Sequence, residues 1–129
     1  MCCYFIFILP AVPPAPRNVT VVNQEIGIIN LYILQPNSKC HITANEVTWK
    51  GNRLWGNNAS DSNSRVLEHP ELEEIFEIDS LIPYSQYKIC VTASTTAGFS
   101  EEELCTMPFS TMEDCLYFFY YLYITYNCF

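Results

Sequence analysis

Apolar and polar residues alternate along the middle of this chain, a pattern of period two that is typical of half-buried β-strands. The alternation returns in short runs separated by turn-forming residues, and no amphipathic stretch of helix length lies between them. The runs predicted as strands are 18–22, 26–34, 46–50, 74–78, 87–93 and 104–107, and the polar stretch 51–65 is expected to hold loops around a short edge strand. Short strands with turns at roughly ten-residue spacing predict an all-β sandwich of six or seven strands rather than a βαβ fold.

The N-terminal segment differs from the middle of the chain because it is almost continuously apolar. Residues 1–13 contain the run Cys2–Leu9, followed by a proline-rich stretch. This run resembles the apolar part of a secretion signal, although no basic residue precedes it. The alternative is a truncated or misassembled N-terminus in front of a domain from a longer protein.

The C-terminal segment 109–129 is rich in aromatic residues. Its last 15 residues, Cys115–Phe129, carry no charge, but a membrane-spanning helix needs about 20 apolar residues. Tyrosine prefers the membrane interface, and no Lys or Arg follows to anchor the end. A membrane anchor and an aggregation-prone appendage both stay open. One domain is therefore expected at 14–108, with unstructured or loosely packed apolar tails on either side.

The most specific motif begins at position 81 and reads L-I-P-Y-S-Q-Y-K-I-C-V-T-A-S-T-T-A-G-F-S. It resembles the L-x-P-x-x-x-Y-x-x-x-V-x-A…G-x-S pattern of fibronectin type III domains. The stretch 14–21, P-A-P-R-N-V-T-V, is similar to the first strand of that family. The resemblance implies a seven-stranded immunoglobulin-like β-sandwich of fibronectin type III type over about residues 14–108. The residues that match the signature are Leu81, Pro83, Tyr87, Val91, Ala93 and Gly98.

The resemblance also implies a role for several of these residues. Leu81 would close the bottom of the sandwich, and Pro83 would stiffen the corner between the two sheets. Tyr87 would be the corner tyrosine, with its ring in the core and its hydroxyl bonded to a nearby backbone group. Gly98 would supply the turn of the hairpin between the last two strands, which the family calls F and G.

Two positions depart from the family pattern. The tryptophan expected three residues before Pro36 is Ile33, and the tyrosine expected two residues before Val47 is Asn45. Both replacements are smaller than the aromatic residues of the family. A lighter core is therefore expected unless Trp49 fills the gap.

Seven cysteines are present, which is an odd number for a chain of 129 residues. None lies in a C-x-x-C pair, and His41 and His69 are the two histidines, so no structural zinc site is expected. Cys40, Cys90 and Cys105 fall inside the predicted domain. One disulfide and one free thiol is the natural allocation, and it indicates an oxidising compartment.

The predicted disulfide joins Cys90 to Cys105. Because residues 87, 89 and 91 face inward, Cys90 faces outward. Positions 90 and 105 are symmetric about a hairpin centred between Ala97 and Gly98, which makes them candidates for a directly opposed pair. Opposed Cα atoms on neighbouring strands lie about 4.5–5.5 Å apart, within the range of a disulfide.

The chain carries a formal charge of −8, with 14 acidic and 6 basic residues. Such a surface repels phosphate backbones, so no nucleic-acid partner is expected. The acids concentrate in 68–79 and 101–103. A solvated face explains them without a calcium site, since no D-x-[DN]-x-[DN]-G loop is present.

Two sequons for N-glycosylation begin at Asn18 and Asn58. Catalytic motifs are missing from the sequence: it has no G-x-S-x-G elbow, no Gly-rich phosphate loop and no H-E-x-x-H. Cys40 and His41 are adjacent, but no third helper residue accompanies them. No enzyme activity and no cofactor are expected.

The resemblance to fibronectin type III domains implies a non-catalytic extracellular module that binds proteins or acts as a spacer, as part of a larger cell-surface receptor or of a matrix or adhesion protein. Its candidate contact surfaces are the turns 37–43 and 95–100. The second turn contains no Arg-Gly-Asp, and no Trp-Ser-x-Trp-Ser precedes the last strand, so neither specialised activity is carried over. The protein partner is unknown, and a membrane contact through the C-terminal tail or a parent protein is open. The alternatives are a fragment without independent function and a single-domain membrane-tethered protein.

Overall fold

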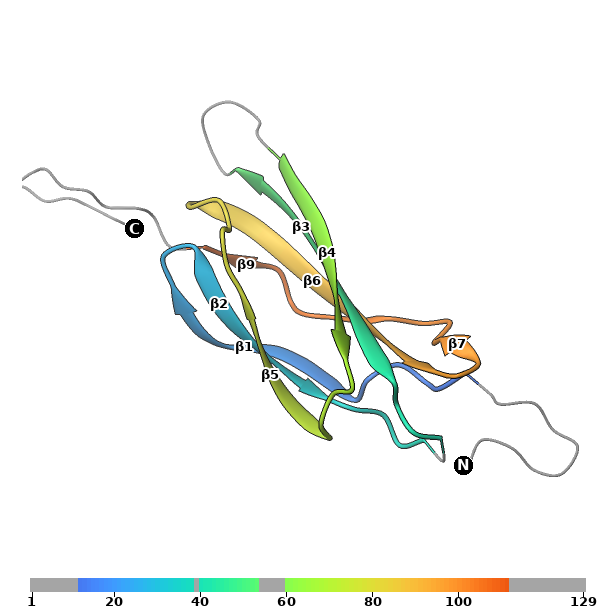
Figure 1. Ribbon diagram of the computed structural model, residues 1–129. Coiled ribbons are helices and arrows are strands. Elements are labelled where there is room, and N and C mark those ends of the chain that lie inside the picture. The colour runs from blue at the N-terminus through green and yellow to red at the C-terminus, as the bar shows by residue number, and fades with distance from the viewer. Residues whose placement is uncertain (1–11, 39, 54–59, 112–129) are drawn as a thin grey trace, which may run out of the picture.

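The computed structural model describes residues 12–38, 40–53 and 60–111, which form strands, turns and loops. The strands are β1 (Asn18–Glu25), β2 (Ile28–Leu34), β3 (Ala44–Arg53), β4 (Ser60–Glu68), β5 (Glu73–Ile78), β6 (Ser85–Thr95), β7 (Gly98–Phe99), β8 (Leu104–Cys105) and β9 (Phe109–Ser110). In this part of the chain they form two antiparallel sheets, β1–β2–β5 and β4–β3–β6, and the second sheet continues from β6 into β7, β8 and β9. The two sheets pack face to face (Figure 1), which confirms the all-β sandwich. Seven strands were expected, and the described residues hold nine: β8 falls in the expected last strand 104–107, and two further short strands, β7 and β9, pair with β6 before and after it.

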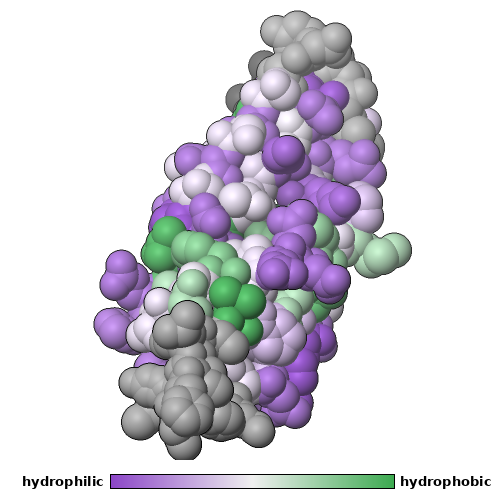
Figure 2. All heavy atoms as spheres, turned by 90° about the vertical axis from the view of Figure 1, so that its right-hand side faces the viewer, coloured by the Kyte–Doolittle hydropathy of each residue, from purple (hydrophilic) through white to green (hydrophobic). Residues whose placement is uncertain are grey.

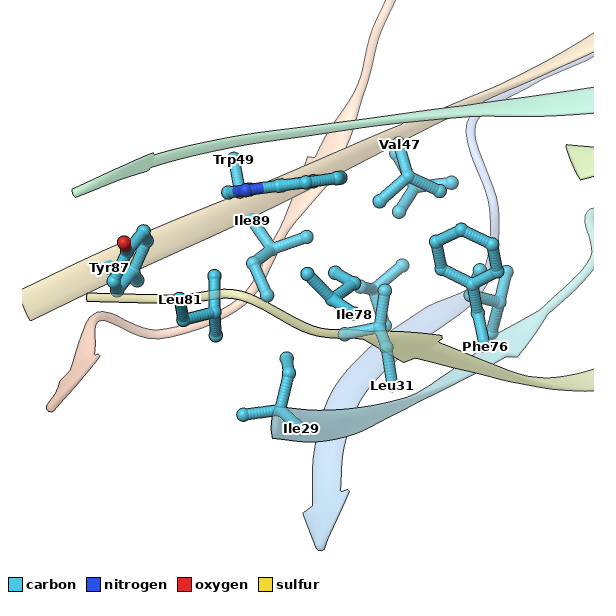
Figure 3. Packing of buried hydrophobic residues seen from close by; sticks show 12 residues of the cluster. Ile29, Leu31, Val47, Trp49, Phe76, Ile78, Leu81, Tyr87 and Ile89 are labelled. Carbon is cyan, nitrogen blue, oxygen red and sulfur yellow. The ribbon is translucent and has the colours of Figure 1, made fainter. Parts of the chain in front are cut away.

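The core lies between the sheets and is built from the inward-facing residues that the period-two pattern predicted. Figure 3 shows side chains from both sheets pointing toward one another. The buried cluster consists of Val19, Ile29, Leu31, Ile33, Val47, Trp49, Phe76, Ile78, Leu81, Tyr87, Ile89 and Val91. Trp49 is only 4% exposed, so it fills the space that the two smaller residues leave open.

A pair of side-chain amides crosses between the two sheets beside this core. Gln35, directly after β2, donates a hydrogen bond to the Oδ1 of Asn45 on β3 at 2.7 Å, and Asn45 donates one back to the Oε1 of Gln35 at 2.9 Å. Both residues are buried, with exposures of 3% and 0%. A buried amide is costly only when it lacks partners, and here each amide satisfies the other. The position where the family has a tyrosine therefore carries a polar contact instead of an aromatic one.

Strand β4 is longer than the short edge strand expected within 51–65. It pairs with β3 over nine consecutive positions, from Ser60 opposite Asn52 to Glu68 opposite Ala44. The alternation misses it because an edge strand with both faces near solvent needs few apolar residues. Even so, Arg65 contributes to the core boundary, since its guanidinium lies 5.2 Å from the ring centroid of Phe76.

The apolar tails expected at 1–13 and 109–129 lie outside the described residues, apart from Val12, Pro13 and 109–111. The last three belong to the sandwich. Phe109 on β9 stacks against Tyr87 with ring centroids 6.3 Å apart, and Thr111 is 4% exposed. The described fold therefore continues past the expected boundary at 108. No helix among the residues that the structure describes is long and apolar enough to cross a membrane.

Each of the three short strands along β6 is followed by a buried hydroxyl residue that continues its pairing for one more position. The backbone N–H of this residue donates to the carbonyl of a β6 residue, at 2.7, 2.8 and 2.7 Å in chain order. Its hydroxyl accepts from the N–H of the same β6 residue, at 3.3, 3.3 and 2.9 Å. The three pairs are Ser100 with Ala93, Thr106 with Ile89, and Thr111 with Ser85.

These hydroxyl groups permit the last strand to break without leaving buried N–H groups of β6 without an acceptor. The residue sums of the paired positions change from 193 in β7 to 195 in β8 and 196 in β9, so the register shifts at each break. A side-chain oxygen takes the place of the carbonyl that the shift moves away. The three residues are buried, with exposures of 7%, 7% and 4%.

We expect Thr106→Val to destabilise the fold by about 1–3 kcal/mol, because the buried N–H of Ile89 loses the hydroxyl that accepts from it. Val matches the shape of Thr, so the loss of packing is small. Urea unfolding of the full-length chain measures the change. Thr106→Ser, which keeps the hydroxyl, is the control, and an equal loss in both variants would contradict the role of the hydroxyl.

Candidate functional site

The residues that match the fibronectin type III signature lie at one end of β6, along it, and at the hairpin that follows. Leu81 is buried between the sheets, and Val91 and Ala93 are fully buried on β6. Pro83 is half-buried in the connection from β5 to β6. Gly98 begins β7 with a φ of 129°, a conformation that favours glycine.

Tyr87 has the geometry of a corner tyrosine. Its side chain is 1% exposed, and its hydroxyl accepts a hydrogen bond from the backbone N–H of Ile82 at 3.0 Å. The hydroxyl also donates to Oδ2 of Asp61 on β4 at 2.6 Å, a contact that the sequence did not indicate. Burial raises the pKa of the Tyr87 hydroxyl well above its usual value, and the hydrogen bond to Asp61 raises it further. The phenol therefore stays protonated and acts as a structural bridge.

Gly51 on β3 provides the space for this ring. It lies directly opposite Tyr87 on one side and Asp61 on the other. A Cβ atom at position 51 would come within 2.6 Å of Cδ1 and Cζ of the Tyr87 ring. The ring thus lies over the glycine and delivers its hydroxyl to the β4 edge, which is why a residue without a side chain stands here.

The structure joins Cys90 to Cys105 by a disulfide on the outer face of the larger sheet, with their Cα atoms 3.9 Å apart. The two residues are direct register partners between β6 and β8. A carboxylate oxygen of Glu103 lies within 4.8 Å of both sulfur atoms. Since the sulfurs are bonded to each other, they are not thiolate ligands for a metal. Cys40 is disulfide-bonded too, so the expectation of one free thiol in the domain is wrong.

The hairpin that contains Gly98 is centred one residue earlier than expected. Thr95 pairs with Gly98, which places Thr96 and Ala97 in the turn. The expected centre between Ala97 and Gly98 holds for the pairing of β8 with β6, which places Cys105 opposite Cys90. It does not hold for β7, because the register shifts between β7 and β8. The sequence identified the correct opposed pair, but it assumed one register from the hairpin to position 105.

The two turns expected as contact surfaces lie together at one end of the sandwich. Thr43 donates from its backbone N–H to the carbonyl of Ser94 at 2.8 Å, and the two side-chain hydroxyls are 2.9 Å apart. His69, in the turn after β4, donates its N–H to the carbonyl of Thr43 at 2.9 Å. Three turns are therefore tied to one another at this end.

The surface at this end is mixed in character. Figure 2 shows hydrophobic residues in the lower half of that view, with hydrophilic ones above and to either side of them. Val12 and Phe99 are 38% and 44% exposed, and His41 is exposed as well. Small exposed apolar groups in a polar rim suit a protein contact of modest size.

The remaining candidate sites are placed as follows. Asn18 is exposed on β1, and the hydroxyl of Thr20 lies 3.4 Å from its Oδ1, so both sequon residues are accessible. Asn58 lies outside the described residues. The acids of 68–79 do not converge on a cation site: within the described ranges, the group of three close ligand atoms is the one with Glu103 and the two disulfide sulfurs.

Two antiparallel sheets, a buried corner tyrosine and a broken last strand define a β-sandwich domain with the fold of fibronectin type III domains. Among solved structures, the chain is similar to the FN1–FN3 domains of chicken CNTN1, with 15% identity over 78% of this chain and 33% of that chain and a TM-score of 0.58. It is similar to a crystal structure of titin domains, with 22% identity, coverage of 78% and 32% and a TM-score of 0.57. A computationally redesigned β-sandwich protein matches with 17% identity, coverage of 80% and 91% and a TM-score of 0.52.

These likenesses concern the fold. The chain spans about a third of the CNTN1 and titin structures that it matches. No family model matches the sequence, and no curated protein matches it.

We expect Tyr87→Phe to destabilise the chain by about 1–3 kcal/mol, because the N–H of Ile82 and the carboxylate of Asp61 both lose their partner. Urea unfolding measures the loss. Tyr32→Phe, on the outer face of β2, is the control and should leave the midpoint almost unchanged. An unchanged midpoint for Tyr87→Phe would show that the hydroxyl does not hold the corner.

Proposed function

We propose that this chain is a non-catalytic extracellular module that binds a protein partner or spaces neighbouring domains within a larger cell-surface receptor or a matrix or adhesion protein. The observation that carries the proposal is the position of the two ends of the described fold. The chain enters the sandwich at the end where the three turns meet, since Arg17 donates its N–H to the carbonyl of Leu34 there. It leaves at the opposite end, where Thr111 is bonded to Ser85 and Ile82 (Figure 1).

This arrangement suits a module in a series. When entry and exit lie at opposite ends, domains joined before and after it extend along one line. The three turns tied together through Thr43 then lie at the junction with the preceding segment, on a scaffold that holds them in place. Binding and spacing need no catalytic group, and the corner tyrosine stays protonated and serves the fold.

The extracellular placement rests on the cysteines. Disulfides persist in oxidising compartments and are rare in the cytosol. Cys90, Cys105 and Cys40 are all disulfide-bonded. The accessible sequon at Asn18 is compatible with the same compartment.

Mass spectrometry of the endogenous protein tests this function. We expect peptides of the sandwich in the membrane or extracellular fraction, within a polypeptide longer than the domain. After digestion without reductant, the peptides of Cys90 and Cys105 should be recovered as one linked species. Recovery of both as free thiols from a cytosolic fraction would contradict the proposal.

A further inference from the structure

The outer face of the larger sheet places two lysines directly opposite each other. Lys50 on β3 and Lys88 on β6 are register partners, and both are exposed. They face outward because their neighbours Trp49 and Ile89 are buried in the core. Like charges directly opposite each other destabilise a strand pair. The arrangement therefore works against the fold unless another charge compensates it.

No such compensation is found within the described residues. The ion pair found among the described residues joins Arg65 to Asp79, and neither Lys50 nor Lys88 takes part in it. The rows of the sheet on either side of the lysines carry uncharged residues. We call the nine positions the lysine patch: Ser60, Ser62 and Ser64 on β4, Thr48, Lys50 and Asn52 on β3, and Gln86, Lys88 and Cys90 on β6. Carboxylates border the patch at Glu46, beyond Thr48 on the same strand, and at Glu103 beside the disulfide, but none lies in it.

This patch contrasts with the rest of the chain. It holds two positive charges and no negative one, on a protein whose formal charge is −8. Around the ammonium groups, hydroxyl and amide side chains offer hydrogen bonds to an anionic ligand. Local conflicts that the fold does not resolve are expected where a surface has a function.

We propose that the lysine patch docks a carboxylate-rich extended segment of a protein partner. An extended segment presents alternate side chains on one face about 6.8 Å apart. Two acidic residues separated by one residue can therefore reach the two ammonium groups together. The proposal rests on the proposed function, because it names the chemistry of the partner that the module binds.

Long polyanions fit this surface less well than a short acidic segment. A sulfated polysaccharide or a nucleic acid would continue past the patch and meet the carboxylates of Glu46 and Glu103 at its border. Charges within about 8 Å of the ligand act on it with little screening at physiological salt. A segment of a few residues can occupy the patch and avoid them.

The test measures fluorescence anisotropy of a labelled ten-residue peptide of alternating glutamate and serine, titrated with the full-length chain with its disulfides intact. A peptide of alternating glutamine and serine is the matched probe. We expect the glutamate peptide to bind at low salt, at least tenfold more tightly than the glutamine peptide, with weaker binding as salt screens the contacts. The double variant Lys50→Gln with Lys88→Gln should lose at least tenfold in affinity.

Two control variants separate the patch from general charge. Lys50→Arg with Lys88→Arg keeps both charges and should keep binding. Arg17→Gln with Arg65→Gln removes the same charge from outside the patch, since Arg17 is bonded to Gln35 and Arg65 lies over the Phe76 ring, and should reduce affinity far less than the lysine double variant does. Circular dichroism confirms that each variant is folded.

A second readout does not depend on any ligand. Removing one of two opposed like charges should raise the urea midpoint, so Lys88→Gln should be more stable than the wild type. If Lys88→Gln is no more stable than the wild type, the two opposed lysines do not destabilise the sheet, and the inference loses its basis.

Several results would overturn the proposal. One is equal binding of the two peptides, and another is unchanged binding by the lysine double variant. Tighter, lysine-dependent binding of heparin than of the glutamate peptide would assign the patch to a polysaccharide instead. These binding measurements use the purified chain and do not depend on where the protein is located. A cytosolic location would therefore refute the extracellular function without affecting the binding result. Failure of peptide binding would refute only this inference.

Discussion

The close approach of the Tyr87 ring to Gly51 is the contact on which the larger sheet depends. The ring lies over a position where even a methyl group would collide with it. From there its hydroxyl meets both the corner after β5, through Ile82, and the edge strand β4, through Asp61. One side chain therefore positions three separate segments. This contact aligns β3, β4 and β6. These strands carry the lysine patch and Cys90 of the disulfide, and the turns connect to their ends.

The amide pair of Gln35 and Asn45 shows how a polar contact can replace an aromatic core residue. It contributes less apolar burial than a tyrosine would, but it is more demanding of geometry. Each amide is satisfied only when the two sheets stand at one distance and one offset. Trp49 supplies the bulk that the pair lacks. The outcome is a core in which size and orientation are provided by different residues.

The sequence predicted the parts of this fold that local pattern controls. Period-two alternation identified β2 and β6 and their buried faces, and the motif around Tyr87 identified the corner and its backbone bond. The contact with Asp61 had no local signal, because β4 alternates between two solvent-facing sides. The amide pair had no local signal either, because Gln35 and Asn45 belong to opposite sheets and only the packing of the sheets brings them together. Strands β7 and β9 were missed because each has two residues, which is too short for an alternation to appear.

The buried hydroxyls that follow the three short strands affect the hydrogen exchange of backbone amides in β6. A backbone carbonyl is fixed by the chain, whereas a serine or threonine oxygen can leave its partner by rotation about one side-chain bond. The N–H groups of Ser85, Ala93 and Ile89 are therefore released without moving the backbone of the last strand. These three amides lie four residues apart, and they should exchange with deuterium before the amides between them. Their exchange requires a rotamer change of the hydroxyl side chain rather than unfolding.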